Sequence, residues 1–335
     1  MKRNDNVSDW ERPGVRVKRL LDQPIISSDL HPNIGPNIQG PSLIKAPEWI
    51  EGRLGDYYLY FADHKGRYIR LAYAHNLLGP WSIYPAGSLQ LEESCFLTDP
   101  PKVTAEQFAQ FEIRLQQSGV AISHDLLSEI TTPHIASPDV HVDTTGQRII
   151  MYFHGLDAVG TQVTRVATSH NGIDFNAQPE VLGRSYMRAF QHDGMTYAIA
   201  MPGQFYRSKD GMHGFEPGPN LFNPNMRHSA VIKRDGELWV FWTQVGEAPE
   251  RILLSRIDLT GDWYGWKAST PTEIPRPERS WEGADAPLAP SVRSTADGQV
   301  NQLRDPAIFE EDGRVYLLYA IAGESGIAIA EVLIP

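Results

Sequence analysis

The sequence predicts an all-β protein, a five-bladed β-propeller, because one local pattern occurs five times along its 335 residues. In each copy, a short apolar segment leads into a glycine-containing turn and then into a stretch rich in aromatic residues and valine. This pattern is typical of a β-hairpin. The five copies span residues 41–61, 138–153, 187–201, 229–242 and 306–319. Five such hairpins in one chain are typical of five blades around a common axis.

A second pattern supports this fold class. A third apolar segment follows each hairpin. In four copies it ends in a polar or glycine-containing turn, after which an aromatic residue is expected to start an outer strand: Trp81, Phe175, Phe215 and Trp263. The 28 glycines and 25 prolines also fit a turn-rich β protein better than a helical one.

The fifth blade lacks an outer strand of its own, since the last regular segment, 326–332, lies close to residue 335. We therefore expect residues 23–28 to supply that strand and to close the ring. Closure of this kind removes an open sheet edge, which would otherwise pair with other chains.

Two stretches do not fit the repeat. Residues 89–133, between blades one and two, predict a small helical insertion, because Thr104 and Gln107 have capping-box spacing before Phe108 and Phe111. Residues 271–302 form a proline-rich loop between blades four and five, and loops this long are often functional. We expect residues 1–335 to form a single domain, with both stretches available to wall a pocket.

Net charge limits the kinds of molecule that the protein can bind, and cysteine content limits the disulfides that it can form. The formal net charge of −11 argues against nucleic acid and against an anionic membrane surface, since both need a basic face. Cys95 is the single cysteine, so no intrachain disulfide can form. We find neither an apolar leader nor a run of about 18 apolar residues, and we expect a cytoplasmic protein. The oligomeric state is left open.

The predicted fold brings two sets of polar residues to one face. The starts of the inner strands and the loops after the second strands meet there. The first set contains Gln39, His134, Asp139, Arg184, Arg188, Arg227, His228, Arg304 and Asp305. The second contains Asp63, His64, Lys65, His154, Gln204, Glu247 and Glu324. Such a ring predicts a pocket for a polar ligand. The alternative is that these residues only hydrate the axis or build turns.

The Asp-Gly hairpins and three short motifs resemble the five-bladed glycoside hydrolases of families 43, 32, 68 and 117. The motifs are Ser137-Pro138-Asp139, Arg227-His228-Ser229 and Arg304-Asp305-Pro306. The resemblance covers residues from about 23 to 335. It implies an axial pocket for an oligosaccharide, an aspartate base, a second aspartate that orients, and a glutamate acid. By the same resemblance, His228 helps to hold the centre of the channel.

The sequence also departs from that family. Blade one reads Gln39-Gly40-Pro41 where the family carries an aspartate, and no blade begins with the Glu-Gly-Pro pattern of the acid. The nearest candidate acids are Glu247, Glu282 and Asp63. A histidine acid, as in family 117, would instead involve His64, His154 or His228.

Glycoside hydrolysis needs two acidic groups beside the scissile bond, one to protonate the leaving oxygen and one to activate water or to attack. Our hypothesis is that Asp139 or Asp305 is the base, that Glu247 is the acid, and that the remaining aspartate orients. The other residues of both sets would bind the substrate, and we expect an exo-acting enzyme.

The cations Lys65, Arg188, Arg227 and Arg304 favour a uronate-bearing or sulfated sugar, because guanidinium groups bind such anions with two hydrogen bonds. Alternatively, they pair with Asp63, Asp139 and Asp305 and are neutralised.

Two other classes of function remain open at this point. One is a sugar-binding propeller without catalysis, and the other is a lyase or phosphorylase that uses a histidine or tyrosine base. We expect no cofactor. A structural cation on the axis near His228 is left open, although no His, Cys or Asp spacing requires a metal.

Overall fold

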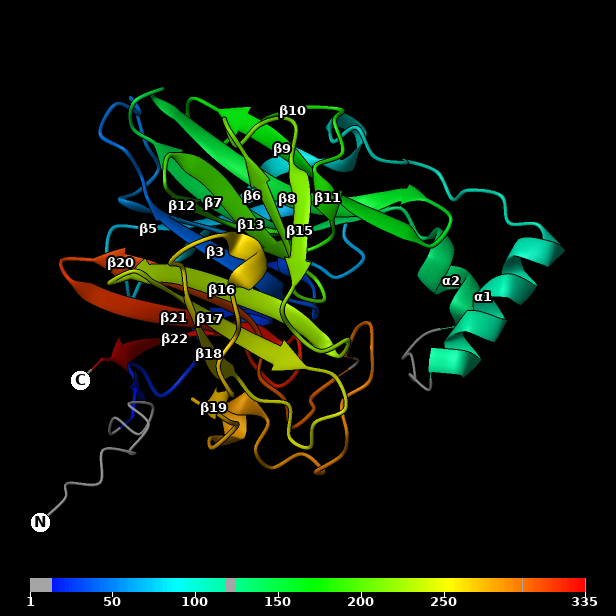
Figure 1. Ribbon diagram of the computed structural model, residues 1–335. Coiled ribbons are helices and arrows are strands. Elements are labelled where there is room, and N and C mark those ends of the chain that lie inside the picture. Colours follow the sequence, from blue (N-terminus) through cyan, green and yellow to red (C-terminus); the bar gives the residue numbers. More distant parts are fainter. Residues whose placement is uncertain (1–13, 119–124, 297, 335) are drawn as a thin grey trace, which may run out of the picture.

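The computed structural model describes residues 14–118, 125–296 and 298–334. We expected no apolar leader in the N-terminal stretch, and this stretch lies outside the described residues up to residue 13. The described residues form five antiparallel sheets arranged as blades around one axis (Figure 1). This confirms the prediction of an all-β, five-bladed propeller, and each predicted hairpin forms the first two strands of a blade.

Each blade runs outward in chain order from its innermost strand. Blade one contains β3 (Gln39–Lys45), β4 (Tyr57–Ala62), β5 (Tyr68–Ala74) and β6 (Ser82–Gln90). Blade two contains β7 (Ile135–Asp143), β8 (Arg148–Ala158), β9 (Thr161–Ser169), β10 (Asn176–Ala177) and β11 (Gly183–Arg184), the last two both paired with β9.

The remaining blades follow the same order. Blade three contains β12 (Arg188–His192), β13 (Met195–Ala200), β14 (Gln204–Ser208) and β15 (Glu216–Asn220). Blade four contains β16 (Met226–Arg234), β17 (Glu237–Gln244), β18 (Leu253–Asp258) and β19 (Thr272–Glu273). Blade five contains β20 (Arg304–Glu311), β21 (Arg314–Ala320) and β22 (Gly326–Leu333).

The N-terminal segment closes the ring, as predicted. The strand β2 (Ile26–Ser27) pairs with Ile327 and Gly326 of β22, and β1 (Arg16–Arg19) pairs with β22 further along. The closure is therefore longer than predicted, because it begins upstream of residue 23. Arg19 adds an ion pair to Glu282 at 2.7 Å, which ties this outer edge to the 271–302 loop.

Tyrosines of two neighbouring blades make the same contact with the next blade. The Tyr60 hydroxyl donates to the carbonyl of Gly172, and the Tyr152 hydroxyl donates to the carbonyl of Gly211, each at 2.7 Å. Both glycines have positive φ, and a Cβ on either would lie within about 3 Å of the tyrosine oxygen. The polar turns read from the sequence are thus docking points between blades.

Apart from blade three, each innermost strand contains a register shift near its start, at the face where the predicted polar residues meet. The shifts fall between Gln39 and Ser42, Ala136 and Asp139, Met226 and Ser229, and Arg304 and Ala307. Such bulges re-aim side chains at the end of a strand. In blade three the corresponding bend lies just before β12, at Tyr186, whose φ is +68°.

The helical insertion is confirmed and projects to one side of the propeller (Figure 1). It contains α1 (Ala105–Ser118) and α2 (Leu126–Thr131). The capping box forms as predicted: the amide of Gln107 donates to the Thr104 hydroxyl, and the Gln107 side chain accepts from the amide of Thr104. No helix within the described residues is long and apolar enough to span a membrane.

One outer-strand prediction is wrong. Trp263 was expected to start the outer strand of blade four, but it begins the short 3-10 helix η4 (Trp263–Gly265). The Asp262 side chain caps this helix by accepting from the amide of Tyr264. The outer strand β19 comes later, within the 271–302 loop. That loop also contains the 3-10 helix η5 (Ser280–Glu282). The other 3-10 helices of the described residues are η1 (Ser28–Leu30), η2 (Pro32–Ile34) and η3 (Leu91–Glu93).

Candidate functional site

A cavity of about 320 Å³ opens at the face where the bulged strand starts meet. Four of the five blades contribute to its wall. Its polar lining is made by Gln39, His64, Glu129, Ser137, His154, Gln162, Arg184, Ser185, Tyr186, Arg227, His228, Arg293 and Ser294. The cavity therefore combines residues that the sequence predicted with others that it did not single out, among them Glu129, Tyr186 and Arg293.

The four bulges, together with the bend at Tyr186 in blade three, place one residue of each blade at an equivalent position around the axis. These residues are Gly40, Ser137, Tyr186, Arg227 and Asp305, which we call the axial ring. All but Arg227 have positive φ. Gly40 occupies this position in blade one, where a Cβ would lie only 3.0 Å from the Cα of Ser137. The missing blade-one aspartate thus has a steric reason, since blade two fills the space its side chain would need.

Asp305 is the axial-ring carboxyl, and it is fully buried. The Tyr186 hydroxyl donates to its Oδ1, and His228 Nδ1 lies 3.5 Å from the same oxygen. Its Oδ2 has no hydrogen-bond partner among the described residues. Burial, reinforced by the charge of Glu324, raises the pKa of Asp305 well above its ordinary value. Asp305 therefore retains its proton to higher pH than an exposed aspartate.

Neutral aromatic rings lie between Asp305 and the cavity. Tyr186 stacks on His228 with 4.8 Å between ring centroids, and the centroid of the tilted His154 ring lies 5.7 Å from that of Tyr186. Burial and the positive charges of Arg227 and Arg304 hold the pKa of His228 well below its usual range. Because His228 Nδ1 accepts from the amide of Asp305 at 3.4 Å, the proton of the neutral ring belongs on Nε2.

His154 and His134 are also neutral. Burial first, then the nearby His134, lowers the pKa of His154 well below 6.5. Burial and Lys65 lower the pKa of His134 to about 3. His134 Nδ1 lies 2.8 Å from the carbonyl of Thr132, and the ring packs edge-on against His154. His134 thus supports the cavity wall without lining it.

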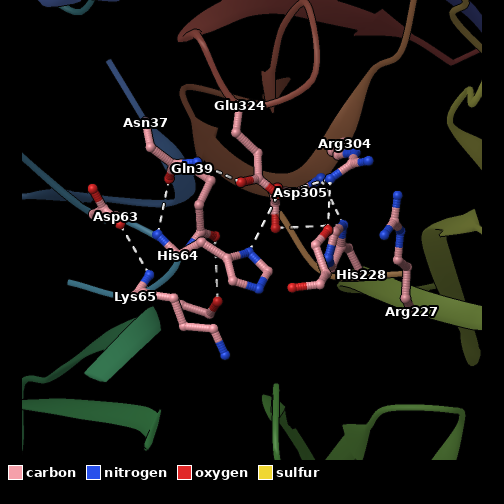
Figure 2. Close-up of polar contacts among 12 residues, drawn as sticks. Asn37, Gln39, Asp63, His64, Lys65, Arg227, His228, Arg304, Asp305 and Glu324 are labelled. Atoms are coloured by element: carbon pink, nitrogen blue, oxygen red, sulfur yellow. Dashed lines mark hydrogen bonds and ion pairs between the residues drawn. The ribbon is translucent and has the colours of Figure 1, made fainter. Parts of the chain in front are cut away.

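A chain of ion pairs connects Arg227, Glu250, Arg304, Glu324 and His64, and Figure 2 shows His64, Glu324 and Arg304 within it. Arg227 Nε donates to Glu250 Oε1 at 2.8 Å, and Arg304 Nε lies 3.6 Å from the other oxygen of Glu250. Arg304 Nη1 donates to Glu324 Oε1 at 2.8 Å, and His64 Nδ1 lies 3.3 Å from that same oxygen. Glu250 was not predicted, although two neighbouring buried arginines require a counter-charge of this kind.

Glu129 brings a carboxylate into the cavity from outside the propeller repeat. It lies on α2 of the insertion and contacts Lys65 Nζ at 3.4 Å. The Ser294 hydroxyl, from the 271–302 loop, donates to its Oε2 at 2.6 Å. A second cavity of about 560 Å³ is lined by Lys65 and by Ser128 and Thr295, the chain neighbours of Glu129 and Ser294. The contact of Glu129, Lys65 and Ser294 therefore lies between an inner and an outer cavity.

Asp139 lies outside the cavity lining. Its Oδ2 contacts His141 Nε2 at 2.7 Å and accepts from the amide of Ala189 at 2.8 Å, so it joins blades two and three. Burial alone would raise the pKa of Asp139, but His141 and Arg188 outweigh it and lower that pKa.

Glu247 also lies away from the cavity lining. Its Oε1 accepts from Arg251 Nη2 at 3.3 Å, and burial raises its pKa. The structure thus brings Asp305 to the cavity region without the other two predicted catalytic carboxylates.

The remaining predicted residues fall into two groups. Gln39, at the cavity, accepts from the Ser137 hydroxyl at 3.4 Å, and Asp63 lines the outer cavity beside Lys65. Arg188 and Gln204 instead hold the scaffold. Arg188 donates to backbone carbonyls of Ser229 and Pro138, and Gln204 donates to that of Gly218.

The four cations that favoured an anionic sugar are all engaged. Lys65 pairs with Glu129, Arg227 with Glu250, Arg304 with Glu250 and Glu324, and Arg188 with backbone carbonyls. The partners are mainly glutamates rather than the expected aspartates. Among the described residues, no group of three or more His, Cys, Asp or Glu could hold a metal ion, including around His228.

Comparisons with known structures place the fold. A β-xylosidase/α-arabinofuranosidase of glycoside hydrolase family 43 from a compost microbial metagenome superposes with a TM-score of 0.55 at 11% identity, covering 94% of each chain. A thermostable family-43 glycoside hydrolase has a TM-score of 0.50 at 15% identity, covering 88% of each chain. The protein therefore has the five-bladed fold of the family-43 glycoside hydrolases.

No protein-family model matches the sequence. A curated relative, the uncharacterized protein R118 of Acanthamoeba polyphaga mimivirus, is 35% identical over 322 residues, which cover 88% of this chain and 83% of the relative. At this identity and coverage, the chain belongs to the same family as the mimivirus protein R118, built on the propeller of the family-43 glycoside hydrolases.

Proposed function

We propose that the protein is a glycoside hydrolase that cleaves an oligosaccharide in the inner cavity. One observation carries this proposal: a buried carboxyl with a raised pKa, Asp305, reaches the cavity through the Tyr186 hydroxyl at the axis of the propeller. Buried carboxyls with raised pKa values are typical of glycosidase acid/base groups. The fold supports the proposal, since it is shared with family-43 enzymes.

Glu129 is the second acidic group that the reaction needs. It lines the inner cavity and lies where the outer cavity begins. If one sugar unit fills the inner cavity and the rest of the chain lies in the outer one, the scissile bond crosses the boundary at Glu129. Glu129 is then placed to protonate the leaving oxygen, with a proton taken up from solvent. Cleavage of one terminal unit at a time follows, so the enzyme is exo-acting.

Asp305 supplies the base. This step requires the ionised form of Asp305, which forms as the pH approaches its raised pKa. The Tyr186 hydroxyl, hydrogen-bonded to the Asp305 carboxylate, then takes a proton from the attacking water as its own proton passes to Asp305, which afterwards releases it to solvent. The water oxygen bonds to the anomeric carbon while the bond to the leaving oxygen breaks. A base with a raised pKa accepts this proton more readily than an ordinary aspartate does. The neutral His228 offers its Nε2 proton to a hydroxyl of the bound sugar.

The test is to incubate the purified protein with neutral, uronic and sulfated oligosaccharides and to follow products by mass spectrometry. We expect products that carry the added mass of water, and much slower turnover by D305N and E129Q. D285N and E112Q are matched controls, since Asp285 and Glu112 are exposed. Activity that survives in both cavity variants, or no product from any substrate, contradicts the proposal.

A substrate with an activated aryl leaving group separates the two roles. Such a group departs without protonation, so it should restore turnover to E129Q and not to D305N. Restored turnover in D305N alone would reverse the two assigned roles. Restored turnover in both variants would reject the assignment.

One observation favours a lyase as the second candidate. Tyr186 and His228, both on the cavity wall, are residue types that abstract and return a proton in elimination reactions. Elimination adds no water and leaves an unsaturated product that absorbs ultraviolet light. The same mass spectra and an absorbance trace therefore decide between hydrolysis and elimination.

A further inference from the structure

Two arginines of the inner cavity lack a charged partner. Arg184, on β11, and Arg293, in the loop between β19 and β20, both line the cavity. Within the part of the chain that the structure describes, no carboxylate forms an ion pair with either one. Among the described residues, the Arg293 guanidinium has one hydrogen bond, from Nη2 to the carbonyl of Pro224 at 3.4 Å. These are not the four arginines and lysines that the sequence singled out as anion-binding groups.

The backbone around Arg184 is fixed while its side chain is left unpaired. The amide of Arg184 donates to the Tyr206 hydroxyl at 3.2 Å, and its carbonyl accepts from the Thr164 hydroxyl at 2.7 Å. The strand β11 is also paired with β9, Arg184 facing Val163. The protein thus holds this arginine at the mouth of the cavity without using its guanidinium for folding.

The charges around Arg293 compensate it only in part, through Glu129. Arg227 is neutralised by Glu250, and Glu129 is engaged by Lys65. Arg293 is partly buried, and burial together with Arg227 outweighs the attraction of Glu129 and lowers the pKa of its guanidinium. A desolvated cation gains more from an anion than an exposed one does, because water screens it less. The cavity wall is therefore locally cationic in a protein whose net charge is −11.

We infer that Arg184 and Arg293 form a subsite for the anionic group of an acidic sugar, a carboxylate or a sulfate. The inference rests on the proposed function for the identity of the ligand as a sugar. Guanidinium groups bind both anions through paired hydrogen bonds. A cavity of about 320 Å³ is at the small end of ligand pockets, which suits a single acidic unit at the end of a chain.

The test measures binding without turnover. The probes are glucuronate and galacturonate, their neutral counterparts glucose and galactose, glucose 6-sulfate, and inorganic sulfate, each titrated by calorimetry. We expect an acidic sugar to bind at least tenfold more tightly than its neutral counterpart, and R293Q or R184Q to remove most of that preference. The exposed Arg16 gives a matched control, R16Q, which should keep the preference.

Each outcome bears on the inference. The inference is supported if R293Q and R184Q reduce the preference for the acidic sugar and R16Q keeps it. The sugar that binds most tightly, uronate or sulfated, then identifies the anion. Equal binding of acidic and neutral sugars, no binding of any acidic sugar, or a preference that survives in the R184Q/R293Q double variant overturns it. Selective binding of an acidic sugar without cleavage would keep this inference and reject only the proposed hydrolysis.

Discussion

Asp139 and Asp305 adjoin a proline near the start of an inner strand, and they have opposite environments. Asp139 follows its proline, contacts His141 and the amide of Ala189, and has a lowered pKa. Asp305 precedes its proline, contacts the Tyr186 hydroxyl, and has a raised pKa. The difference teaches that the order of two residues within a motif decides whether a carboxylate faces the axis or the neighbouring blade.

The register of the strands explains this difference. Ala136 and Arg304 occupy equivalent positions before the bulge, and Asp139 and Ala307 occupy equivalent positions after it. The counterpart of Asp305 in blade two is therefore Ser137, which lines the cavity, and Asp139 lies two positions further along the strand. Because the bulge lies between these two positions, the regular alternation of side chains is interrupted there, and Asp139 contacts blade three instead of the cavity.

The largest expected difference between the two aspartates is in turnover. We expect D305N to lower kcat on the cleaved oligosaccharide by about a hundredfold to ten-thousandfold, since it removes the proton acceptor behind Tyr186. D139N should stay within a few-fold of the wild type, because Asp139 does not line the cavity. Steady-state rates of both variants, with unchanged circular dichroism, check this. Equal losses in the two variants would break the comparison.

The axial ring itself can be tested at Gly40. In G40A the new Cβ would lie 3.0 Å from the Cα of Ser137, at a residue whose φ is +61°. We expect the free energy of unfolding to fall by about 2–3 kcal/mol. The matched control is G236A, at a hairpin tip with φ +84° and no atom within 4 Å, which should lose only about 1 kcal/mol. Urea unfolding of both variants measures the difference, and equal losses would show that blade two tolerates a side chain there.

The pH dependence of stability should have opposite signs at the two sites. The pKa of Asp305 is raised in the folded protein, so the unfolded chain loses this proton first as the pH rises from about 4. Folding stability then falls until the pH reaches the raised folded pKa. D305N should remove that fall. Unfolding free energies of wild type and variant at pH 4 and pH 7 test this, and parallel pH dependence would contradict it.

The smallest expected effect is at Asp139. Its lowered pKa stabilises the fold above about pH 4, and this contribution is lost as the pH falls through the folded pKa. The pKa of His141 is raised, mainly because the charge of Asp139 outweighs burial, and its contribution is lost as the pH rises above about 6.5. D139N should therefore cost most stability between these values. The His141 side chain is 39% exposed, so we expect less than about 1 kcal/mol. A loss that is equal at pH 5 and pH 8 would contradict the role of the pair.

Much of the fold could be predicted because its signals are local. Hairpin turns, the Thr104–Gln107 capping box and the missing outer strand of blade five are each visible within a few residues of sequence. The failure at Trp263 has the same origin, since the cap from Asp262 competes locally with a strand.

The candidate site was harder to predict because its key pairings are long-range. Glu129 reaches the cavity from α2 to meet Lys65 and Ser294, far apart in the chain. The sequence left open whether Arg227 and Arg304 were free or paired with aspartates, and only the folded ring shows that Glu250 and Glu324 neutralise them. Residue type predicted which groups would gather at the axis. Which carboxylate pairs with each arginine, and which side chains are covered by others, depends on strand register and on loops outside the repeated hairpins.

The closure of blade five links the order of synthesis to the order of folding. Arg16–Arg19 pairs with residues 330–333, so the strand made near the beginning of the chain has no partner until the strand near its end exists. The entropy cost of joining such distant segments grows only with the logarithm of their separation. Pairing of β1 with β22 is therefore delayed mainly by the time of synthesis, because four blades can form before residues 330–333 have been made. A nascent chain that stops before Gly326 would leave β1 as an unpaired segment available to other chains.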